Sequence, residues 1–91
     1  MYIIYMKEHE KILKALANRR RLQIIKYIKD KKLVTVTSIV RHIKLSYKST
    51  SKHLAILHGA GLVDKEQRNL FMFYSIANPL PKLAKQVIDI I

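Results

Sequence analysis

The chain has 91 residues, 49% of them apolar, and its 18 Lys and Arg against 6 Asp and Glu give a net charge of +12. This length suits one domain, residues 1–91, with a marginal core of its own, and the absence of cysteine excludes disulfides and thiolate metal sites. No apolar run reaches the roughly 18 residues of a membrane span, so we expect a soluble, cytoplasmic protein. The high positive charge indicates that it associates with a polyanion.

The N-terminal third predicts a pair of helices. The first helix is indicated by apolar residues at helical spacing, which are Ile12, Leu13, Leu16 and Ala17. Asn18 then offers its side-chain amide as the N-cap of a second helix. The buried side of that helix is expected to hold Leu22, Ile25 and Ile28. The two helices are thus predicted to form a hairpin.

The middle third predicts two short helices separated by a tight turn. Val34 and Val36 suit a minimal strand, and Thr35 can cap a short helix that turns Ile39, Val40 and Ile43 inward. Lys44-Leu45 is the turn, and Ser46 caps the next helix, residues 46–60, which Gly61 ends. This helix is expected to turn Thr50, Leu54 and Leu57 inward, and Tyr47, Lys48, Ser51, Lys52 and Ala55 outward.

The C-terminal third predicts a β-hairpin and a last helix. Leu62–Glu66 and Leu70–Ile76 are β-type runs, with the turn and a charged tip at Gln67-Arg68-Asn69. Alternation directs Met72, Tyr74 and Ile76 to the core and Phe71 and Phe73 outward. Asn78 is expected to cap the last helix, with Pro79 at its first position. The predicted fold is mainly α with a small β-hairpin, in the order α-α-(β)-α-α-β-β-α: a winged helix-turn-helix.

The charge pattern predicts where a polyanion would bind. Residues 31–63 contain no Asp or Glu, but they carry Lys31, Lys32, Arg41, Lys44, Lys48 and Lys52. In a helix-turn-helix the N-terminal part of the second helix enters the major groove. We therefore expect base contacts from Tyr47, Lys48, Ser51 and Lys52, phosphate contacts from Ser46 and Ser49, flanking contacts from Arg41 and Lys44, and a minor-groove contact from Arg68.

Two segments resemble a known family. The runs Ala15–Ile25 and Leu45–Val63, the second with its Ser51-Lys-His-Leu core and its Ala60-Gly-Leu-Val end, are similar to the signature segments of the ArsR/SmtB-type transcriptional repressors. The resemblance extends from about Glu10 to Ile76. It implies a homodimer that binds an inverted-repeat operator and occludes transcription. This chain has Asn18-Arg19 where family members usually have Asp-Pro.

This chain lacks the metal ligands that metal-responsive members of the family carry. Threonines stand at the Cys-x-Cys positions of one family metal site, Thr35 and Thr37, and hydroxyls are poor ligands for soft ions. Asn78, Leu80 and Ile91 match the Asp and His positions of the other site. We therefore expect no metal, no cofactor and no obvious effector site.

Apolar residues are concentrated at the two ends of the chain, where a monomer would expose them to water. We expect a second copy to cover them, although they can instead fold back on their own chain. The resemblance places the dimer interface on the first and last helices. The interface residues we expect are Ile3, Ile4, Ile12, Leu80, Leu83, Ala84, Val87, Ile88 and Ile91.

Other functions have weaker support in the sequence. Ser49 and His53 are spaced like a nucleophile and base, but no carboxylate lies nearby in the sequence. We therefore expect no catalytic residue and no enzymatic activity. The histidines form no close same-face pair. Arg19-Arg20-Arg21 point in different directions, so only some of them can reach DNA. The open alternatives are a nonspecific, architectural DNA-binding protein and a winged-helix protein-interaction module.

Overall fold

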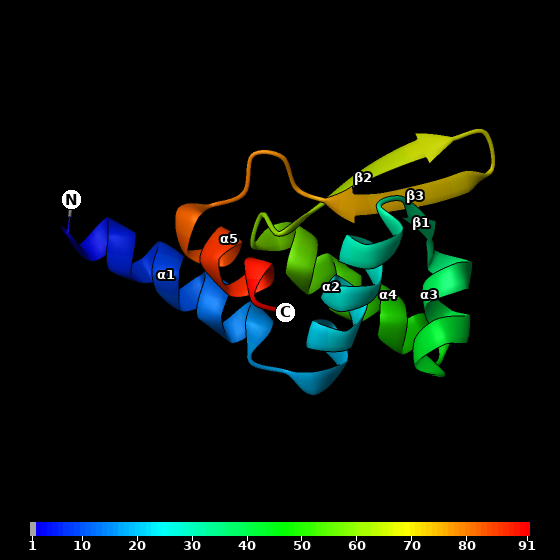
Figure 1. The fold of residues 1–91 in the computed structure, drawn as a ribbon, viewed down its shortest axis with the longest axis horizontal. Helices are drawn as coiled ribbons and strands as arrows, with labels where there is room; N and C mark the ends of the chain where they lie inside the picture. Colours follow the sequence, from blue (N-terminus) through cyan, green and yellow to red (C-terminus); the bar gives the residue numbers. More distant parts are fainter. Residues whose placement is uncertain (1) are drawn as a thin grey trace.

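The computed structural model describes the backbone of residues 2–91 and the side chains of residues 5–91. Its elements in chain order are α1 (Tyr2–Leu16), α2 (Arg19–Lys31), β1 (Val34–Thr35), α3 (Val36–Ile43), α4 (Tyr47–Gly59), β2 (Val63–Arg68), β3 (Phe71–Ile76) and α5 (Lys82–Asp89) (Figure 1). The fold is mainly α with a small sheet, and the predicted order of elements is confirmed.

The sheet is antiparallel, with strand order β1-β3-β2. Val34 of β1 pairs with Tyr74, which also pairs with Lys65 of β2. The long β2–β3 hairpin extends past the helices as a wing (Figure 1). The short first strand ties the base of this wing to the N-terminus of α3.

Three predicted helix caps are confirmed. The Asn18 side chain accepts a hydrogen bond from the Arg21 N–H at 3.1 Å, and the Ser46 hydroxyl accepts one from the Ser49 N–H at 3.1 Å. Thr35 forms a reciprocal capping box with Ser38. These side chains satisfy N–H groups that a helix N-terminus otherwise leaves unpaired, so each helix begins where its cap lies.

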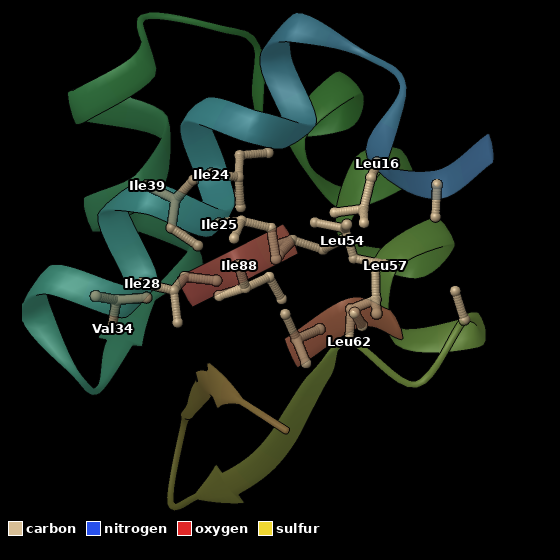
Figure 2. Packing of buried hydrophobic residues seen from close by; sticks show 14 of the residues in the cluster. Leu16, Ile24, Ile25, Ile28, Val34, Ile39, Leu54, Leu57, Leu62 and Ile88 are labelled. Atoms are coloured by element: carbon tan, nitrogen blue, oxygen red, sulfur yellow. The ribbon is translucent and has the colours of Figure 1, made fainter. Parts of the chain in front are cut away.

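One apolar core lies between the helices and the base of the wing. Among its fully buried members are Ile24, Ile25, Ile28, Ile39, Leu54, Leu57 and Leu62. Figure 2 shows side chains from α2, α3 and α4 converging with Ile88 of α5. The β-branched residues of α2 thus form the centre against which α4 is held.

The buried face of α1 is narrow. Leu13 is 50% exposed and Ala17 is exposed, whereas Ile12, Ala15 and Leu16 are buried. Residues at i, i+3 and i+4 share one helix face, and Leu13 lies a hundred degrees around from Ile12. The helix expected from this spacing is present, and Leu13 lies beside its buried face.

The strands and their turn also need correction. Val36 is the first residue of α3 and is not in a strand. Gln67 and Arg68 belong to β2, where they pair with Met72 and Phe71, and the turn is Asn69-Leu70. Asn69 has a φ of 55°, a left-handed conformation that asparagine tolerates well, and two-residue hairpin turns use such residues.

The last helix begins later than predicted. Asn78 does not cap it; the Asn78 N–H donates to the Asp64 carboxylate at 3.2 Å, and α5 starts after Pro81. Each proline disfavours helical backbone in the residue before it, so Asn78 and Leu80 both stay out of the helix. The second proline, not the first, marks the start of α5.

Candidate nucleic-acid interface

The helix-turn-helix is formed by α3, a tight turn and α4. Lys44 makes the turn with φ 55° and ψ 51°, and its N–H donates to the Val40 carbonyl at 2.9 Å. On α4, Thr50, Leu54 and Leu57 are buried as predicted. Because these three residues anchor one face of α4, its opposite face is directed away from the core.

The outward face of α4 carries the predicted contact residues. Tyr47 is 61% exposed, and Lys48 and Lys52 are exposed, whereas Ser49 and Ser51 are half-buried. Ser46 is exposed, and its oxygen is already the acceptor of the N-cap bond. Its O–H remains a donor, which suits a phosphate oxygen at the positive end of the helix.

The flanking basic residues lie close to the same helix end. Arg41 is exposed in the last turn of α3, and Lys44, also exposed, is the turn residue two positions before the N-cap of α4. Since no acid occurs between residues 31 and 63, this segment contributes no carboxylate that would repel phosphates. The exposure and charge of this helix pair therefore agree with the expected phosphate contacts.

Arg68 is less available than the sequence indicated. Its guanidinium forms an ion pair with Glu66 of the same strand face, and it lies over the Phe73 ring at 5.3 Å from the ring centroid. The hydrogen bond from Arg68 lowers the pKa of the Glu66 carboxyl, so the pair stays charged near neutral pH. Both partners are more than half exposed, so the wing presents an arginine that is paired within its own strand and remains in contact with solvent.

Two of the three consecutive arginines are engaged within the fold. Arg20 donates to the Ile43 carbonyl at 2.9 Å, at the C-terminus of α3. Arg21 donates to the carbonyls of Ala15 at 2.6 Å and Lys14 at 3.2 Å. These bonds satisfy carbonyls at helix C-termini that would otherwise lack partners. Arg19 is the exposed member.

His53 belongs to the same polar connection. Its Nδ1 lies 3.2 Å from Nη1 of Arg21, which links α4 to α2 and to the end of α1. Burial, followed by the positive charges of Arg21 and Arg20, lowers the pKa of His53 below its usual value. A neutral imidazole can accept the arginine hydrogen bond, so this histidine has a hydrogen-bonding role within the fold.

No metal cluster is seen among residues 5–91: the described side chains include no group of three His, Cys, Asp or Glu placed to share an ion. The Thr35 hydroxyl is engaged in its capping box. His42 stacks on Tyr27 with ring centroids 4.2 Å apart. Within the described part of the chain, no helix is long and apolar enough to cross a membrane.

The residues expected at a dimer interface divide into three groups. Ile12, Ala84 and Ile88 are buried in the core of their own chain, so they have little surface left for a partner. Those that remain half-buried are Leu80, Leu83, Val87 and Ile91. The Ile3 and Ile4 side chains lie outside the described residues.

A further apolar surface, made of residues that were not among those expected at the interface, runs along α1. Tyr5 is 58% exposed, Met6 45% and Leu13 50%. Met6, Leu13 and Ala17 line a shallow groove on this helix. The missed signal was the second apolar stripe of α1, offset from the Ile12 stripe that faces the core.

A tight turn into a helix with an exposed polar and basic face, followed by a β-hairpin, defines a winged helix-turn-helix DNA-binding domain. Residues 18–65 match the family model described as "Bacterial regulatory protein, arsR family". The chain belongs to this family of DNA-binding transcriptional regulators; it is not an enzyme.

Two characterised relatives are similar over most of the chain. The transcriptional repressor PagR of Bacillus anthracis is 30% identical over 81% of this chain and 74% of its own length. The transcriptional activator HlyU of Vibrio cholerae is 37% identical over 74% of this chain and 61% of its own length. The family thus includes regulators of both signs.

Solved structures agree with the fold. Reduced HlyU from Vibrio cholerae superposes with a TM-score of 0.82 at 29% identity, covering 98% of this chain and 90% of that one. PagR gives 0.81 at 26% identity, covering 97% of each chain. A winged helix-turn-helix domain from Mycobacterium bovis, described as homodimeric, gives 0.83 at 24% identity, covering 97% of this chain and 78% of that one.

Proposed function

We propose that residues 1–91 act as one winged helix-turn-helix domain that dimerises, binds an inverted-repeat operator and represses transcription by occluding the promoter. The observation that carries the proposal is the exposed face of α4: Tyr47, Lys48 and Lys52 project from a helix whose other face is anchored by buried side chains. Their segment contains no acid.

Each α4 residue has a role set by its chemistry. Lys48 and Lys52 donate to guanine O6 and N7 or to phosphate, and the Tyr47 hydroxyl donates or accepts at a base edge. Ser51 is half-buried, so it reaches bases only where the groove wall approaches α4 closely. Ser46, Ser49, Arg41 and Lys44 position the helix through phosphates, which carry no sequence information directly.

Dimerisation is supported by the apolar surface of α1 and by the half-buried residues of α5. Tyr5, Met6 and Leu13 expose apolar area on one helix, and α1 packs against α5 within the chain. A two-fold axis near these helices buries the same patch on both subunits. The interface therefore extends over α1 and α5, with Ile12, Ala84 and Ile88 behind it in each core.

Repression is the simpler sign of regulation for this chain. Occlusion of a promoter needs only specific DNA binding, whereas activation needs a further contact with the transcription machinery. PagR, a repressor, aligns over 81% of the chain.

The test is selection of bound duplexes from a random pool at about 150 mM salt, followed by titration of the selected site against scrambled DNA. We expect an inverted repeat with half-sites about 34–36 Å apart. Lys52→Gln should weaken binding, whereas the control Lys82→Gln, on α5 at the far end from α3 (Figure 1), should not.

The alternatives predict different results. A nonspecific architectural protein binds selected and scrambled DNA equally, and loses affinity for both when lysines are replaced. A protein-interaction module shows little salt-dependent DNA binding. A reporter with the selected site upstream decides the sign, and a rise in transcription on expression of the protein would contradict repression.

A further inference from the structure

The wing has no net charge, unlike the helices beside it. Its charged residues are Asp64, Lys65, Glu66 and Arg68, two of each sign. Arg68 is paired with Glu66 and stacked over Phe73. The wing as a whole therefore adds no net positive charge to the basic surface of α3 and α4, and its apolar tip is its more distinctive feature.

The tip of the wing is apolar and exposed. Leu70 is 94% exposed and the next residue, Phe71, is 59% exposed. Single exposed leucines are common on protein surfaces, but hairpin tips favour Gly, Asn, Asp and Ser because these residues suit turns. Here a leucine occupies the second turn position, with an exposed aromatic residue directly after it.

The tip is also supported from behind. The Phe71 and Phe73 rings are 6.5 Å apart and tilted by 60°, and the Arg68 guanidinium covers Phe73. The full register of β2 and β3 extends to the Arg68–Phe71 pair. The leucine is therefore presented on a paired, braced hairpin, which lowers the conformational entropy lost when it inserts into a partner.

The length of the wing matches the spacing of DNA grooves. Tyr74 lies at the wing base, where it pairs with Val34 of β1, the strand that leads directly into α3 of the helix-turn-helix. Leu70 is four residues farther along the strand, about 14 Å at about 3.4 Å per residue. Half a helical turn of DNA, from a major groove to the adjacent minor groove, is about 17 Å.

Resting on the proposed DNA binding, we propose that Leu70, with the neighbouring Phe71, is an apolar wedge for the minor groove next to the major groove that α4 occupies. Apolar side chains inserted between base steps unstack them in part and kink the duplex. Flexible pyrimidine–purine steps kink most easily. The wing thus selects a deformable step without hydrogen bonds to bases.

The test uses the whole protein and the operator obtained by selection. Leu70→Asn should lower operator affinity about tenfold, as expected for losing one apolar anchor, and should leave the salt dependence unchanged because no phosphate contact is lost. Energy transfer between duplex ends should show reduced bending. The fluorescence of 2-aminopurine at the contacted step should fall back towards that of stacked DNA.

A charge-neutral control separates the wedge from an electrostatic wing. The double variant Glu66→Gln/Arg68→Gln removes the ion pair but keeps the wing neutral, so the salt dependence should again be unchanged. If the slope of log affinity against log salt concentration is lower by about one for this variant, Arg68 contacts a phosphate. That result would contradict a wing whose contribution is apolar.

Other outcomes distinguish the two proposals. If the wild-type protein binds no operator, the proposed function fails. If it binds an operator and Leu70→Asn binds and bends that operator equally well, only the wedge fails. Loss of regulation by Leu70→Asn with unchanged DNA binding would also overturn the wedge, because the tip would then contact a protein.

Discussion

Thr50 is a buried hydroxyl on the helix proposed to read DNA. Its side chain is fully buried, and Oγ1 has no hydrogen-bond partner among the described residues. Burying an unpaired polar group costs free energy because its hydrogen bonds to water are lost without replacement. We therefore predict that Thr50→Val raises the free energy of unfolding.

The magnitude follows from the surroundings of the hydroxyl. An unsatisfied buried group costs about 1–3 kcal/mol. Valine places a methyl group where the hydroxyl lies, keeps the β-branch and has nearly the same helix propensity. We expect a gain of about 1 kcal/mol, which for a chain of this size raises Tm by roughly 4–8 °C.

Urea denaturation at one fixed protein concentration measures the change, since dimerisation makes stability depend on concentration. Thr50→Ser, which keeps the hydroxyl and loses the methyl group, should be destabilised. The exposed residue Thr37 supplies the surface control, and Thr37→Val should change stability by less than about 0.5 kcal/mol. If Thr50→Val lowers stability, the hydroxyl is hydrogen-bonded in solution and the reasoning is refuted.

Further predictions concern the Arg21–His53 connection and α1. Arg21→Gln loses the charged bond to the Ala15 carbonyl and should cost about 1–3 kcal/mol in urea denaturation; unchanged stability would make the connection incidental. The pKa of His53 is lower in the folded protein than in the unfolded chain, so on acidification the unfolded chain binds the proton first. The free energy of unfolding is therefore unaffected by this group above about pH 6.5, and it decreases as the pH falls from there towards the folded pKa. His53→Gln should flatten this part of the profile of Tm against pH. An unaltered profile would show that His53 is not the source of the pH dependence. Leu13→Asp should shift the protein from dimer to monomer in sedimentation equilibrium; a persistent dimer would place the interface elsewhere.

Much of the candidate site was predictable from the sequence because its signals are local. Ser46 caps its own helix, and the spacing of Thr50, Leu54 and Leu57 defines which side of that helix is buried. The exposed face then follows from helical geometry. The absence of acids between residues 31 and 63 is likewise a property of the chain itself.

The sequence by itself therefore determined the two helices of the helix-turn-helix, their N-caps and the distribution of charge. The tertiary structure decided which arginines are engaged within the fold, because their partners lie elsewhere in the chain. Arg20 donates to the Ile43 carbonyl, 23 positions away, and Arg21 meets His53, 32 positions away. Hydrogen bonds and burial between distant segments exist only after the helices pack, so no local pattern encodes them.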